Sequence, residues 1–440
     1  MIIQHATIIN EGERFTGSLL IREGRIASIS HDQEIHLEGE EEMEAQGCLL
    51  LPGIIDEHVH MRDPGLTAKG DMETETRAAA AGGVTTVLDM PNVVPQTTTL
   101  SLLEERYRIG AEKCHVNYAF YLGATNDNLD EILHADPHRT PAIKLFMGSS
   151  TGNMLVDDDN QLRRIFQHVP LPIMTHCEDT TRINRRMAQA KERYGPDPAV
   201  EHHPEIRDAE ACFLSTELAV RLARETGARL HVAHISTARE LALFQPNDDQ
   251  ITAEACVPHL LYSDADYPRL GSLIKCNPAI KTDADREALR GALSDGRIRC
   301  VATDHAPHLP SEKEGGACRA MSGMPMVQFS LVSMLQLVDE RVLTLERMVQ
   351  LMCHHPAELF QISQRGFIRE GYWADLVLVR RNESPWKLVP ECIQSRCGWS
   401  PRMGDLFHWS VLSTWVNGCR VWDGKQVDVR VHGAPVLFRR

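Results

Sequence analysis

The chain has 440 residues, of which 46 are basic and 61 acidic, so its net charge is −15 with histidine neutral. Hydrophobic residues make up 42% and charged residues 24%, close to the globular norm, which excludes collagen-like, coiled-coil and disordered chains. A chain this acidic is a poor candidate for binding a nucleic-acid backbone, although one well-placed arginine can still bind a small anionic substrate. No apolar run approaches the roughly 18 residues that span a bilayer, and the first residues do not read as a secretory signal. We therefore expect a cytoplasmic protein that binds neither nucleic acid nor membrane.

The first fifty residues predict short strands. Residues 17–24 and 25–30 alternate apolar and polar side chains around a glycine-containing turn, which predicts a hairpin. From residue 49 onward, short apolar runs alternate with longer helical stretches, the pattern of repeated βα units. Eight such runs occur, at 49–60, 84–90, 116–122, 142–146, 171–176, 229–234, 250–254 and 298–304. Helical spacing marks the stretches 71–81, 100–112, 208–226 and 283–293.

Eight such units fit either a closed barrel or an open, doubly wound sheet. The positions of the reactive side chains favour the barrel, because they fall at or near the C-terminal ends of several different runs. These residues are His58, His60, Asn92, Lys144, His176, His234 and Asp304. The ends of the first, fourth, fifth, sixth and eighth strands meet at one rim of a barrel, whereas in an open sheet they lie apart.

Strand patterns return after about residue 367, at 372–379 and 411–421, with Asn417-Gly418 as a plausible hairpin turn. We expect the two ends of the chain to pair with each other beside the barrel. The predicted architecture is therefore α/β: a (β/α)₈ TIM-like barrel over residues 51–366, and a small flanking β-sandwich domain built from residues 1–50 and 367–440.

The segment Asp56-Glu-His58-Val-His60 places two imidazoles two residues apart. On a strand these rings point to the same side and can reach one metal ion, and Asp56 shares that side and could orient a ligand. The alternative is a histidine pair on a polar rim without a metal. Further candidate ligands at matching strand ends favour the metal, and together they exceed what one ion needs, which suggests two ions. These further residues are Lys144, His176, His234 and Asp304.

Lys144 is the unusual member of this set. A lysine on an inward-facing strand end beside two cations is disfavoured as an ammonium ion. Two outcomes follow from the residues alone: a salt-bridged structural lysine, or a neutral amine that captures carbon dioxide and becomes a bridging carbamate.

These motifs together resemble the metal-dependent amidohydrolases that act on cyclic amides, a group that includes dihydroorotases, dihydropyrimidinases and allantoinases. The resemblance rests on Asp-x-His-x-His, the strand-end lysine, two later single histidines and Thr303-Asp-His-Ala-Pro-His308, and it covers essentially the whole chain. Three segments are most similar to dihydroorotases: His58-Val-His60-Met-Arg62-Asp-Pro-Gly65, Asp89-Met-Pro-Asn92 and Cys276-Asn277-Pro278.

The resemblance implies two zinc ions bridged by an N6-carboxylated Lys144, with cobalt or manganese as other fitting metals. One ion would be held by His58, His60, Lys144 and Asp304, and the other by Lys144, His176 and His234. Substrate binding would fall to Arg62, Asn92, Asn277, His308 and, through a nearby backbone amide, Gly323. The family also implies a homodimer.

Arg62 separates the substrate classes within this group. A guanidinium just above the metals offers a two-pronged contact to a carboxylate, which dihydroorotate carries and dihydrouracil and hydantoin lack. The alternative is a surface arginine paired with Asp63. The reaction expected from the resemblance is the reversible cyclisation of N-carbamoyl-L-aspartate to L-dihydroorotate in de novo pyrimidine (UMP) biosynthesis. A hydroxide bound by the two zinc ions would attack the ring amide, with Asp304 acting as base and then as acid.

Two other functions stay open at this point. One is a cyclic-amide hydrolase for a ring without a carboxylate, of the dihydropyrimidinase, hydantoinase or allantoinase type. The other is an inactive relative that serves as a scaffold or binding subunit. Residues 312–314 predict either a mobile lid or a solvated loop.

Overall fold

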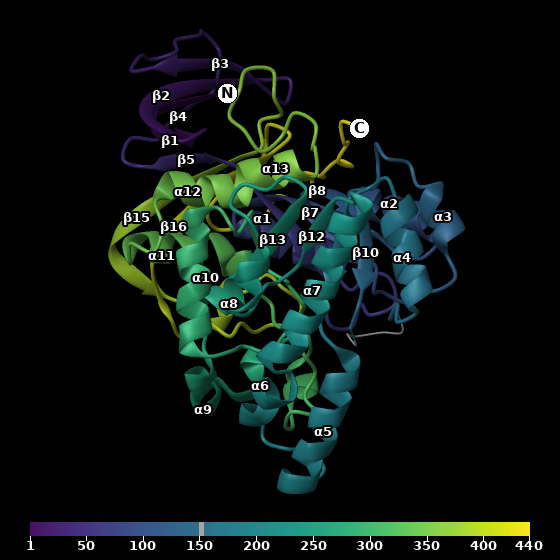
Figure 1. The fold of residues 1–440 in the computed structure, drawn as a ribbon. Coiled ribbons are helices and arrows are strands. Elements are labelled where there is room, and N and C mark those ends of the chain that lie inside the picture. Colours follow the sequence, from purple (N-terminus) through teal and green to yellow (C-terminus); the bar gives the residue numbers. More distant parts are fainter. Residues whose placement is uncertain (149–153) are drawn as a thin grey trace.

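The computed structural model describes residues 1–148 and 154–440, and its centre is a barrel of eight parallel strands (Figure 1). The strands are β6 (Ile54–Val59), β7 (Val84–Asp89), β8 (Asn117–Phe120), β10 (Ile143–Phe146), β11 (Ile173–His176), β12 (Leu230–Val232), β13 (Ile251–Cys256) and β14 (Cys300–Ala302). Each strand overlaps one of the eight predicted apolar runs. The predicted barrel is therefore confirmed.

Hydrogen bonds close the barrel at both seams of its sheet. The run that forms β8 continues as the short strand β9 (Leu122–Gly123), which pairs with β10. At the other seam, Val59 bridges to His305, and the His60 backbone N–H donates to the His305 carbonyl at 2.7 Å. The first and last strands are thus joined, and the ends of all eight strands face one rim.

Helices surround the barrel (Figure 1). They are α1 (Met72–Ala81), α2 (Leu100–Lys113), α3 (Leu129–Leu133), α4 (Asp159–His168), α5 (Thr180–Tyr194), α6 (His203–Ile206), α7 (Ala209–Thr226), α8 (Val257–Leu261), α9 (Tyr267–Leu270), α10 (Asp283–Asp295), α11 (Ser330–Asp339), α12 (Leu345–Val349) and α13 (His355–Leu359). The four predicted helices are α1, α2, α7 and α10. Each begins after a side-chain cap, as α7 does at Asp208, and α7 ends at Gly227, whose φ of +78° suits glycine.

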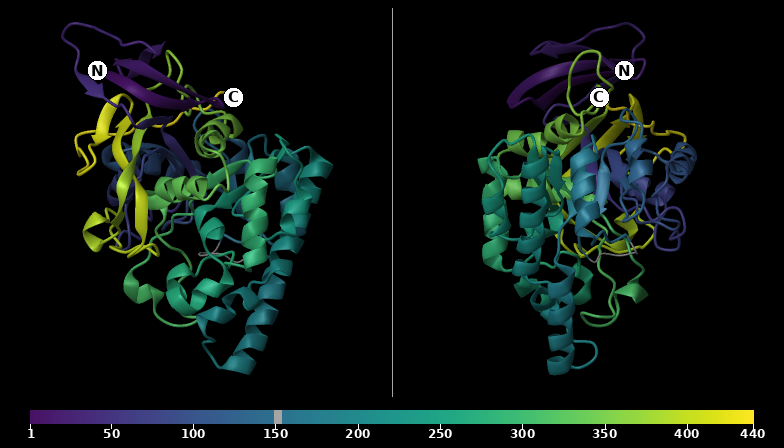
Figure 2. Two further views of the ribbon diagram at one scale, coloured as in Figure 1. Left: turned by 90° about the vertical axis from the view of Figure 1, so that its left-hand side faces the viewer. Right: turned by 45° about the vertical axis from the view of Figure 1, so that its right-hand side comes forward.

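Strands from both ends of the chain form one sheet on the flank of the barrel (Figure 2). Its members are β1 (Ile2–Asn10), β2 (Glu13–Arg22), β3 (Arg25–His31), β4 (Glu42–Glu44), β5 (Leu49–Pro52), β15 (Leu376–Lys387), β16 (Leu406–Val416) and β17 (Cys419–Trp422). Strand β5 joins the two ends, because it pairs with β1 on one side and β15 on the other. The predicted turn at Asn417-Gly418 is present with positive φ at both residues.

This sheet confirms the predicted β unit built from both chain ends. Seven of its strands follow one another in the order β17-β16-β15-β5-β1-β2-β3, and β4 pairs with β1 beside this path. One apolar cluster unites side chains such as Ile8, Leu50 and Leu376. The division of the chain at residues 50 and 366 stays a prediction.

The barrel interior contains an apolar cluster. Small and medium apolar side chains fill its middle, among them Leu88, Ala119 and Met174, and Phe360 and Phe438 belong to the same buried cluster. The C-terminal segment reaches this cluster by pairing with β8, where the Val436 N–H donates to the Tyr118 carbonyl at 2.9 Å. Polar side chains lie in the interior as well, where Glu57, His231 and Glu254 form a buried group and the His231 ring lies 5.8 Å from that of Phe360.

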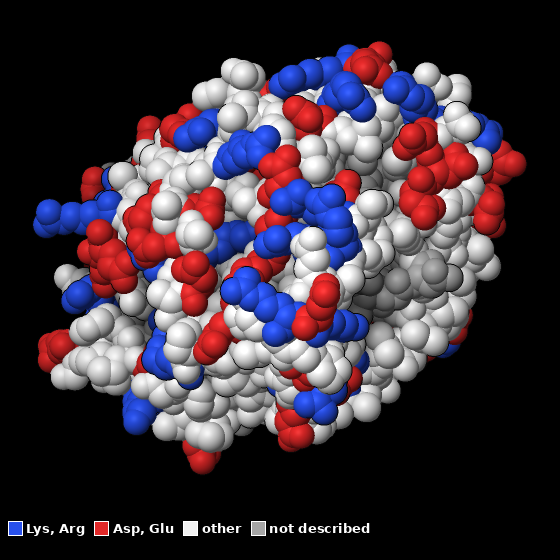
Figure 3. All heavy atoms as spheres, turned by 60° about the horizontal axis from the view of Figure 1, so that its bottom comes forward, with Lys and Arg blue, Asp and Glu red and all other residues white. Residues whose placement is uncertain are grey.

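The surface carries both signs of charge. On the face shown in Figure 3, lysine and arginine side chains lie among aspartate and glutamate side chains over part of the area, and uncharged residues cover much of the rest. Within the part of the chain that the structure describes, no helix is long and apolar enough to cross a membrane.

Candidate active site

A pocket with an empty volume of about 410 Å³ lies at the C-terminal rim of the barrel. Its walls bring together all the predicted site residues except Asn92 and His308. The lining residues are His58, His60, Arg62, Lys144, Phe146, His176, His234, Asn277, Asp304, Ala306, Ser322 and Gly323. Side chains from the ends of five different strands and from later loops therefore converge on one space, as barrel sites require.

Asp304 contacts both histidines of the first ligand group, His58 and His60. Its Oδ1 lies 3.0 Å from His60 Nε2 and 3.3 Å from His58 Nε2. Burial by itself would raise the pKa of Asp304, but the two neighbouring imidazoles lower it well below its ordinary value, so the group is a carboxylate. Burial lowers the pKa of His60 to about 4, which keeps this ring neutral and able to bind a metal.

His176 and His234 form the second group. His176 Nδ1 lies 3.0 Å from His234 Nε2, and burial lowers the pKa of both rings, so neither is charged near neutral pH. Two nitrogens bound to one tetrahedral zinc ion at about 2.0–2.1 Å lie about 3.4 Å apart. The facing rings are therefore spaced to share one cation after a small outward shift.

Lys144 on β10 has a fully buried side chain that faces the pocket. Its Nζ has no hydrogen-bond partner among the residues described, and no ion pair involves it there. Burial lowers the pKa of Lys144 to about 8, against the opposing influence of Glu254 and Asp304. The salt-bridged lysine, one of the two outcomes that the sequence left open, is thus not what the structure contains. An orphaned amine at this position fits a chemically modified, metal-bridging lysine.

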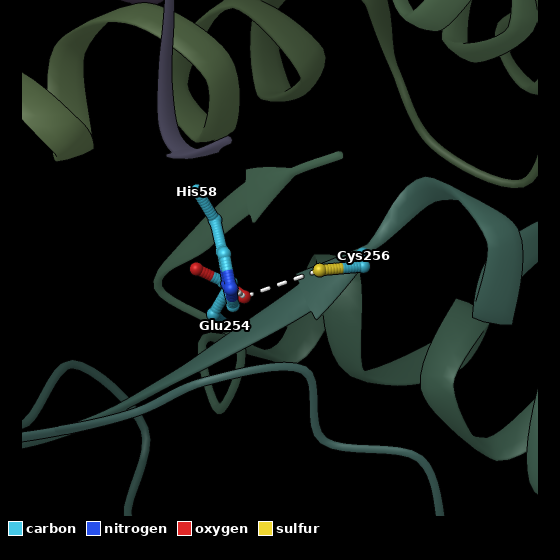
Figure 4. A group of neighbouring side chains, drawn as sticks. All are labelled: His58, Glu254 and Cys256. Atoms are coloured by element: carbon cyan, nitrogen blue, oxygen red, sulfur yellow. Dashed lines mark hydrogen bonds and ion pairs between the residues drawn. The ribbon is translucent and has the colours of Figure 1, made fainter. Parts of the chain in front are cut away.

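A carboxylate that the sequence analysis did not single out holds His58. Glu254 Oε1 accepts a hydrogen bond from His58 Nδ1 at 2.8 Å, and Cys256 donates its Sγ to the same oxygen at 3.1 Å (Figure 4). Placing the ring hydrogen on Nδ1 leaves the lone pair of Nε2 free, on the side of Asp304. Glu254 could have been noticed from the sequence, because it is a carboxylate at the end of the seventh apolar run, where an unpaired charge is costly.

Two further side chains orient ligand rings in the same way. Asn92 Oδ1 lies 2.8 Å from His60 Nδ1, and Glu178 Oε2 lies 3.0 Å from His176 Nε2. Burial opposes the charge of Glu178, but Arg207 and His176 lower the pKa of this carboxyl to about 2. Each ring therefore has an acceptor on its far nitrogen, which leaves its near nitrogen for a metal.

Asp56 contacts a proposed ligand residue through the backbone and not through the ring, because its Oδ1 accepts from the His58 N–H at 3.3 Å. Its carboxylate accepts from Thr303 Oγ1 at 2.6 Å and from the Thr303 backbone N–H at 3.2 Å. The pairing of β6 with β7 is irregular between Asp56 and Val59, and this irregularity breaks the regular alternation of side chains. Asp56 instead ties the first strand of the barrel to the last.

Arg62 is buried, which rules out a surface arginine paired with Asp63. Its Nε donates to the Pro307 carbonyl at 3.1 Å, whereas Asp63 pairs with Lys113 Nζ at 2.7 Å. Burial lowers the pKa of Arg62 to about 10, so the guanidinium keeps its charge at neutral pH. A buried, charged guanidinium in the pocket wall needs an anionic partner.

His308 lies behind Arg62 and does not line the pocket. Lys69 Nζ can only donate, and it lies 3.2 Å from His308 Nδ1, so the ring hydrogen belongs on Nε2 and donates to the Ser322 carbonyl at 3.0 Å. Arg62 Nη2 lies 3.1 Å from His308 Nε2, which has no lone pair in this tautomer. The hydrogens of Nη2 therefore remain available to a ligand in the pocket.

The loop around Gly323 forms another wall. The Gly323 N–H donates to the Lys275 carbonyl at 2.8 Å, and its own carbonyl accepts from Lys313 Nζ at 2.7 Å. A side chain could not fit at Gly323, because its Cβ would lie 2.8 Å from the Ala306 Cβ and its φ is +129°. Lys313 is buried and also donates to the Met321 carbonyl at 2.7 Å, so the stretch 312–314 is anchored by this lysine rather than fully solvated.

The donor set of imidazoles and one carboxylate suits a divalent transition metal, and the comparison with known proteins agrees. The model of the amidohydrolase family matches residues 49–419. A dihydroorotase of Halobacterium salinarum is 34% identical over 93% of this chain and 96% of its own length. Dihydroorotases of Methanothermobacter thermautotrophicus and Lactobacillus johnsonii are 30% and 31% identical, over 94% and 95% of this chain and 93% and 97% of their own lengths.

Solved structures share the fold. An L-hydantoinase (dihydropyrimidinase) from Arthrobacter aurescens superposes with a TM-score of 0.91 and 27% identity, over 97% of this chain and 96% of its own. A dihydropyrimidinase from Brevibacillus agri gives 0.88 with 21% identity, over 100% of this chain and 99% of its own, and shows likeness of fold alone. The chain belongs to the amidohydrolase family of metal-dependent hydrolases, in the branch that contains these dihydroorotases.

Proposed function

We propose that this protein is a dihydroorotase, which interconverts N-carbamoyl-L-aspartate and L-dihydroorotate in de novo pyrimidine biosynthesis. The observation that carries the proposal is the buried guanidinium of Arg62 in the wall of the pocket, beside the histidine and aspartate cluster. Both substrates carry a carboxylate that can neutralise this charge through paired hydrogen bonds. The relatives that match nearly the whole chain bear the same name.

The same proposal includes two zinc ions bridged by a carboxylated Lys144, with cobalt or manganese as alternatives. Burial lowers the pKa of Lys144 to about 8, which increases the share of neutral amine that can add to carbon dioxide. When bound, the metals polarise the amide carbonyl and lower the pKa of water. The assigned ligands are His58, His60, Lys144 and Asp304 for one ion, and Lys144, His176 and His234 for the other.

Asp304 is the proposed proton carrier. The pKa of Asp304 lies well below its ordinary value, so this group is a carboxylate that can accept a proton from the attacking water. Asp304 then delivers this proton to the ring nitrogen that leaves as the amide opens. In the cyclisation direction, the steps run in reverse: Asp304 removes the proton from the carbamoyl nitrogen and returns it to the oxygen that departs as water.

The remaining assigned residues frame the substrate. Asn92 has its Oδ1 on His60 and would use its amide Nδ2 toward the ring, while Asn277 lines the pocket. His308 is proposed to act at the same subsite, from its place behind Arg62. The backbone amides beside Gly323 are proposed to contact the ring, because the N–H of Gly323 itself is bonded to Lys275.

A substrate panel tests the proposal. Zinc-loaded protein is incubated separately with L-dihydroorotate, dihydrouracil, hydantoin and allantoin, and ring opening is followed by ultraviolet absorbance. We expect turnover of L-dihydroorotate alone. Turnover of another ring would keep the amidohydrolase chemistry and refute the substrate, whereas metal uptake without any turnover would favour an inactive scaffold.

The homodimer and the cytoplasmic location stay predictions of the same proposal. Light scattering coupled to size-exclusion chromatography tests the first, with a mass of twice the chain as the expected result. Fractionation of cells that produce the protein tests the second.

A further inference from the structure

Glu254 is a fully buried carboxylate on β13, a strand that supplies none of the six proposed metal ligands. Figure 4 shows its carboxylate meeting the ring of His58, with Cys256 two residues further along the strand. A buried charge is costly unless it is paired. Because β13 carries no proposed metal ligand, the charge of Glu254 needs another explanation.

One oxygen of this carboxylate serves two proposed ligands at once. Oε1 accepts from His58 Nδ1 at 2.8 Å and from the His234 backbone N–H at 2.9 Å. In the proposed arrangement, His58 belongs to one ion and His234 to the other. The second oxygen, Oε2, has no hydrogen-bond partner in the described part of the chain and lies 3.8 Å from His231 Nε2, so the hydrogen bonds gather at Oε1.

Each of the two hydrogen bonds selects one state where a second is possible, a ring tautomer in His58 and a backbone conformation in His234. The bond to His58 selects the ring form with hydrogen on Nδ1, which leaves Nε2 free toward Asp304. The bond to His234 holds a backbone with a φ of +39°, a left-handed conformation that is strained for a non-glycine residue. Loss of the Oε1 acceptor would therefore release the ring of His58 and the strained backbone of His234.

We propose that Glu254 is a positioning residue that couples the two metal positions, because one of its oxygens sets the ring of His58 and the backbone of His234 together. This inference rests on the proposed two-metal function. It assigns a role to the seventh strand of the barrel, which otherwise contributes no group to the metals.

The variant Glu254→Gln tests the inference, because it keeps the shape and removes the charge that strengthens both bonds. Glu240→Gln is the matched control. Glu240 is also buried, accepts from Thr216 and Thr237 at 2.8 Å each, and bonds to none of the six proposed ligands in the contacts described. Metal-free wild type and both variants are titrated with Zn²⁺ and with Co²⁺, and the visible absorption of the cobalt forms is recorded.

We expect Glu254→Gln to bind both ions about 10- to 100-fold more weakly, as is usual when the partner of a ligating histidine is lost. Its cobalt spectrum should differ from the wild type, while Glu240→Gln matches the wild type in both readouts. The inference would be overturned if Glu254→Gln had the metal affinity and cobalt spectrum of Glu240→Gln. It would also be overturned if both variants lost affinity equally, or if Glu254→Gln bound only one of the two ions more weakly. A wild-type protein that takes up no metal would instead refute the proposed function. If Glu254→Gln fails to fold, Glu254→Asp with Glu240→Asp as control carries the same expectation.

Discussion

At the scale of single residues, the centre combines buried charge with strained backbone. Arg62, His234 and Asp304 all have positive φ, at +66°, +39° and +49°. Such conformations cost about 1–3 kcal/mol each and persist only where the surroundings fix them. Here the surroundings are specific hydrogen bonds, such as that from Arg62 Nε to the Pro307 carbonyl. The residues that carry the proposed chemistry therefore have backbone conformations that lower the stability of the fold.

Replacing Arg62 with methionine should abolish most turnover of L-dihydroorotate. The loss of one partner of a buried, charged hydrogen-bonded pair costs about 2–5 kcal/mol, which we expect to appear in kcat/KM. Steady-state kinetics measure the effect. Lys113→Met is the control, because Lys113 pairs with Asp63 and does not line the pocket. An Arg62→Met enzyme with unchanged KM and kcat would contradict the assigned carboxylate contact.

Replacing Lys144 with alanine should remove metal and activity together, because the variant has no amine to become the bridging group. Metal content by elemental analysis and turnover are measured on the same sample. Added acetate or propionate should restore part of both, since a short carboxylate can occupy the place of the missing group. If Lys144→Ala kept two ions per chain and full activity, the bridging role would be wrong.

The residue types of the site could be predicted from the sequence, whereas their partners could not. His58, His176 and Asp304 end apolar runs, and parallel strands bring such ends to one rim whatever the loops do. The ring of His58 pairs with Glu254 on a distant strand, whereas alternation along one strand pointed to Asp56, which contacts only the His58 backbone. The pairing of β6 is irregular between Asp56 and Val59. A one-residue irregularity changes which side chains face each other, and no local pattern announces it.

At the scale of elements, the loop after β14 is tied to the segment after α5. The Asp197 carboxylate accepts from the backbone N–H groups of Gly316, Cys318 and Arg319 at 2.8, 3.0 and 3.1 Å. The same loop carries Ser322 and Gly323 to the pocket wall. The sequence predicted a lid or a solvated loop here, because polar residues around glycines look alike in both, and the anchoring carboxylate lies more than a hundred residues earlier.

Replacing Asp197 with asparagine should loosen this loop. Hydrogen exchange of the 315–323 amides, measured by mass spectrometry, is expected to accelerate in Asp197→Asn at pH 7 and to stay unchanged in the barrel strands. Burial opposes the charge, but Arg319 and the three amides lower the pKa of Asp197 well below its ordinary value. A carboxylate with a lowered folded pKa stabilises above its unfolded pKa of about 4 and loses that contribution as the pH falls further. Wild-type protection of these amides should therefore decline below about pH 4. Equal exchange in both proteins at pH 7 would contradict the anchor.

At the scale of the whole molecule, the C-terminal segment helps to complete the barrel core. Phe438 is buried in the cluster that includes Phe360, while its neighbour Leu437 is exposed. The strand pattern near the C-terminus predicted the flanking sheet correctly, but not this return to the barrel. Short segments without a period, such as 433–440, give no sequence signal for where they pack.

Replacing Phe438 with alanine should lower the free energy of unfolding by about 3–5 kcal/mol, the usual cost of deleting a buried aromatic ring. Denaturant unfolding of the metal-loaded protein measures it. Leu437→Ala, with a side chain in solvent, should leave the unfolding free energy nearly unchanged. Similar values for the two variants would show that the segment does not hold the core.

The position of β5 has a consequence for the protein while it is being synthesised. On the nascent chain, β5 emerges early and can pair with β1, but its other edge stays open until β15 leaves the ribosome, because Leu50 pairs with Leu378. An open strand edge invites pairing with other chains. Contacts between such distant parts of a chain also form slowly. During most of translation, the unpaired edge of β5 can therefore bind other chains. Chaperones would act on the chain during this interval.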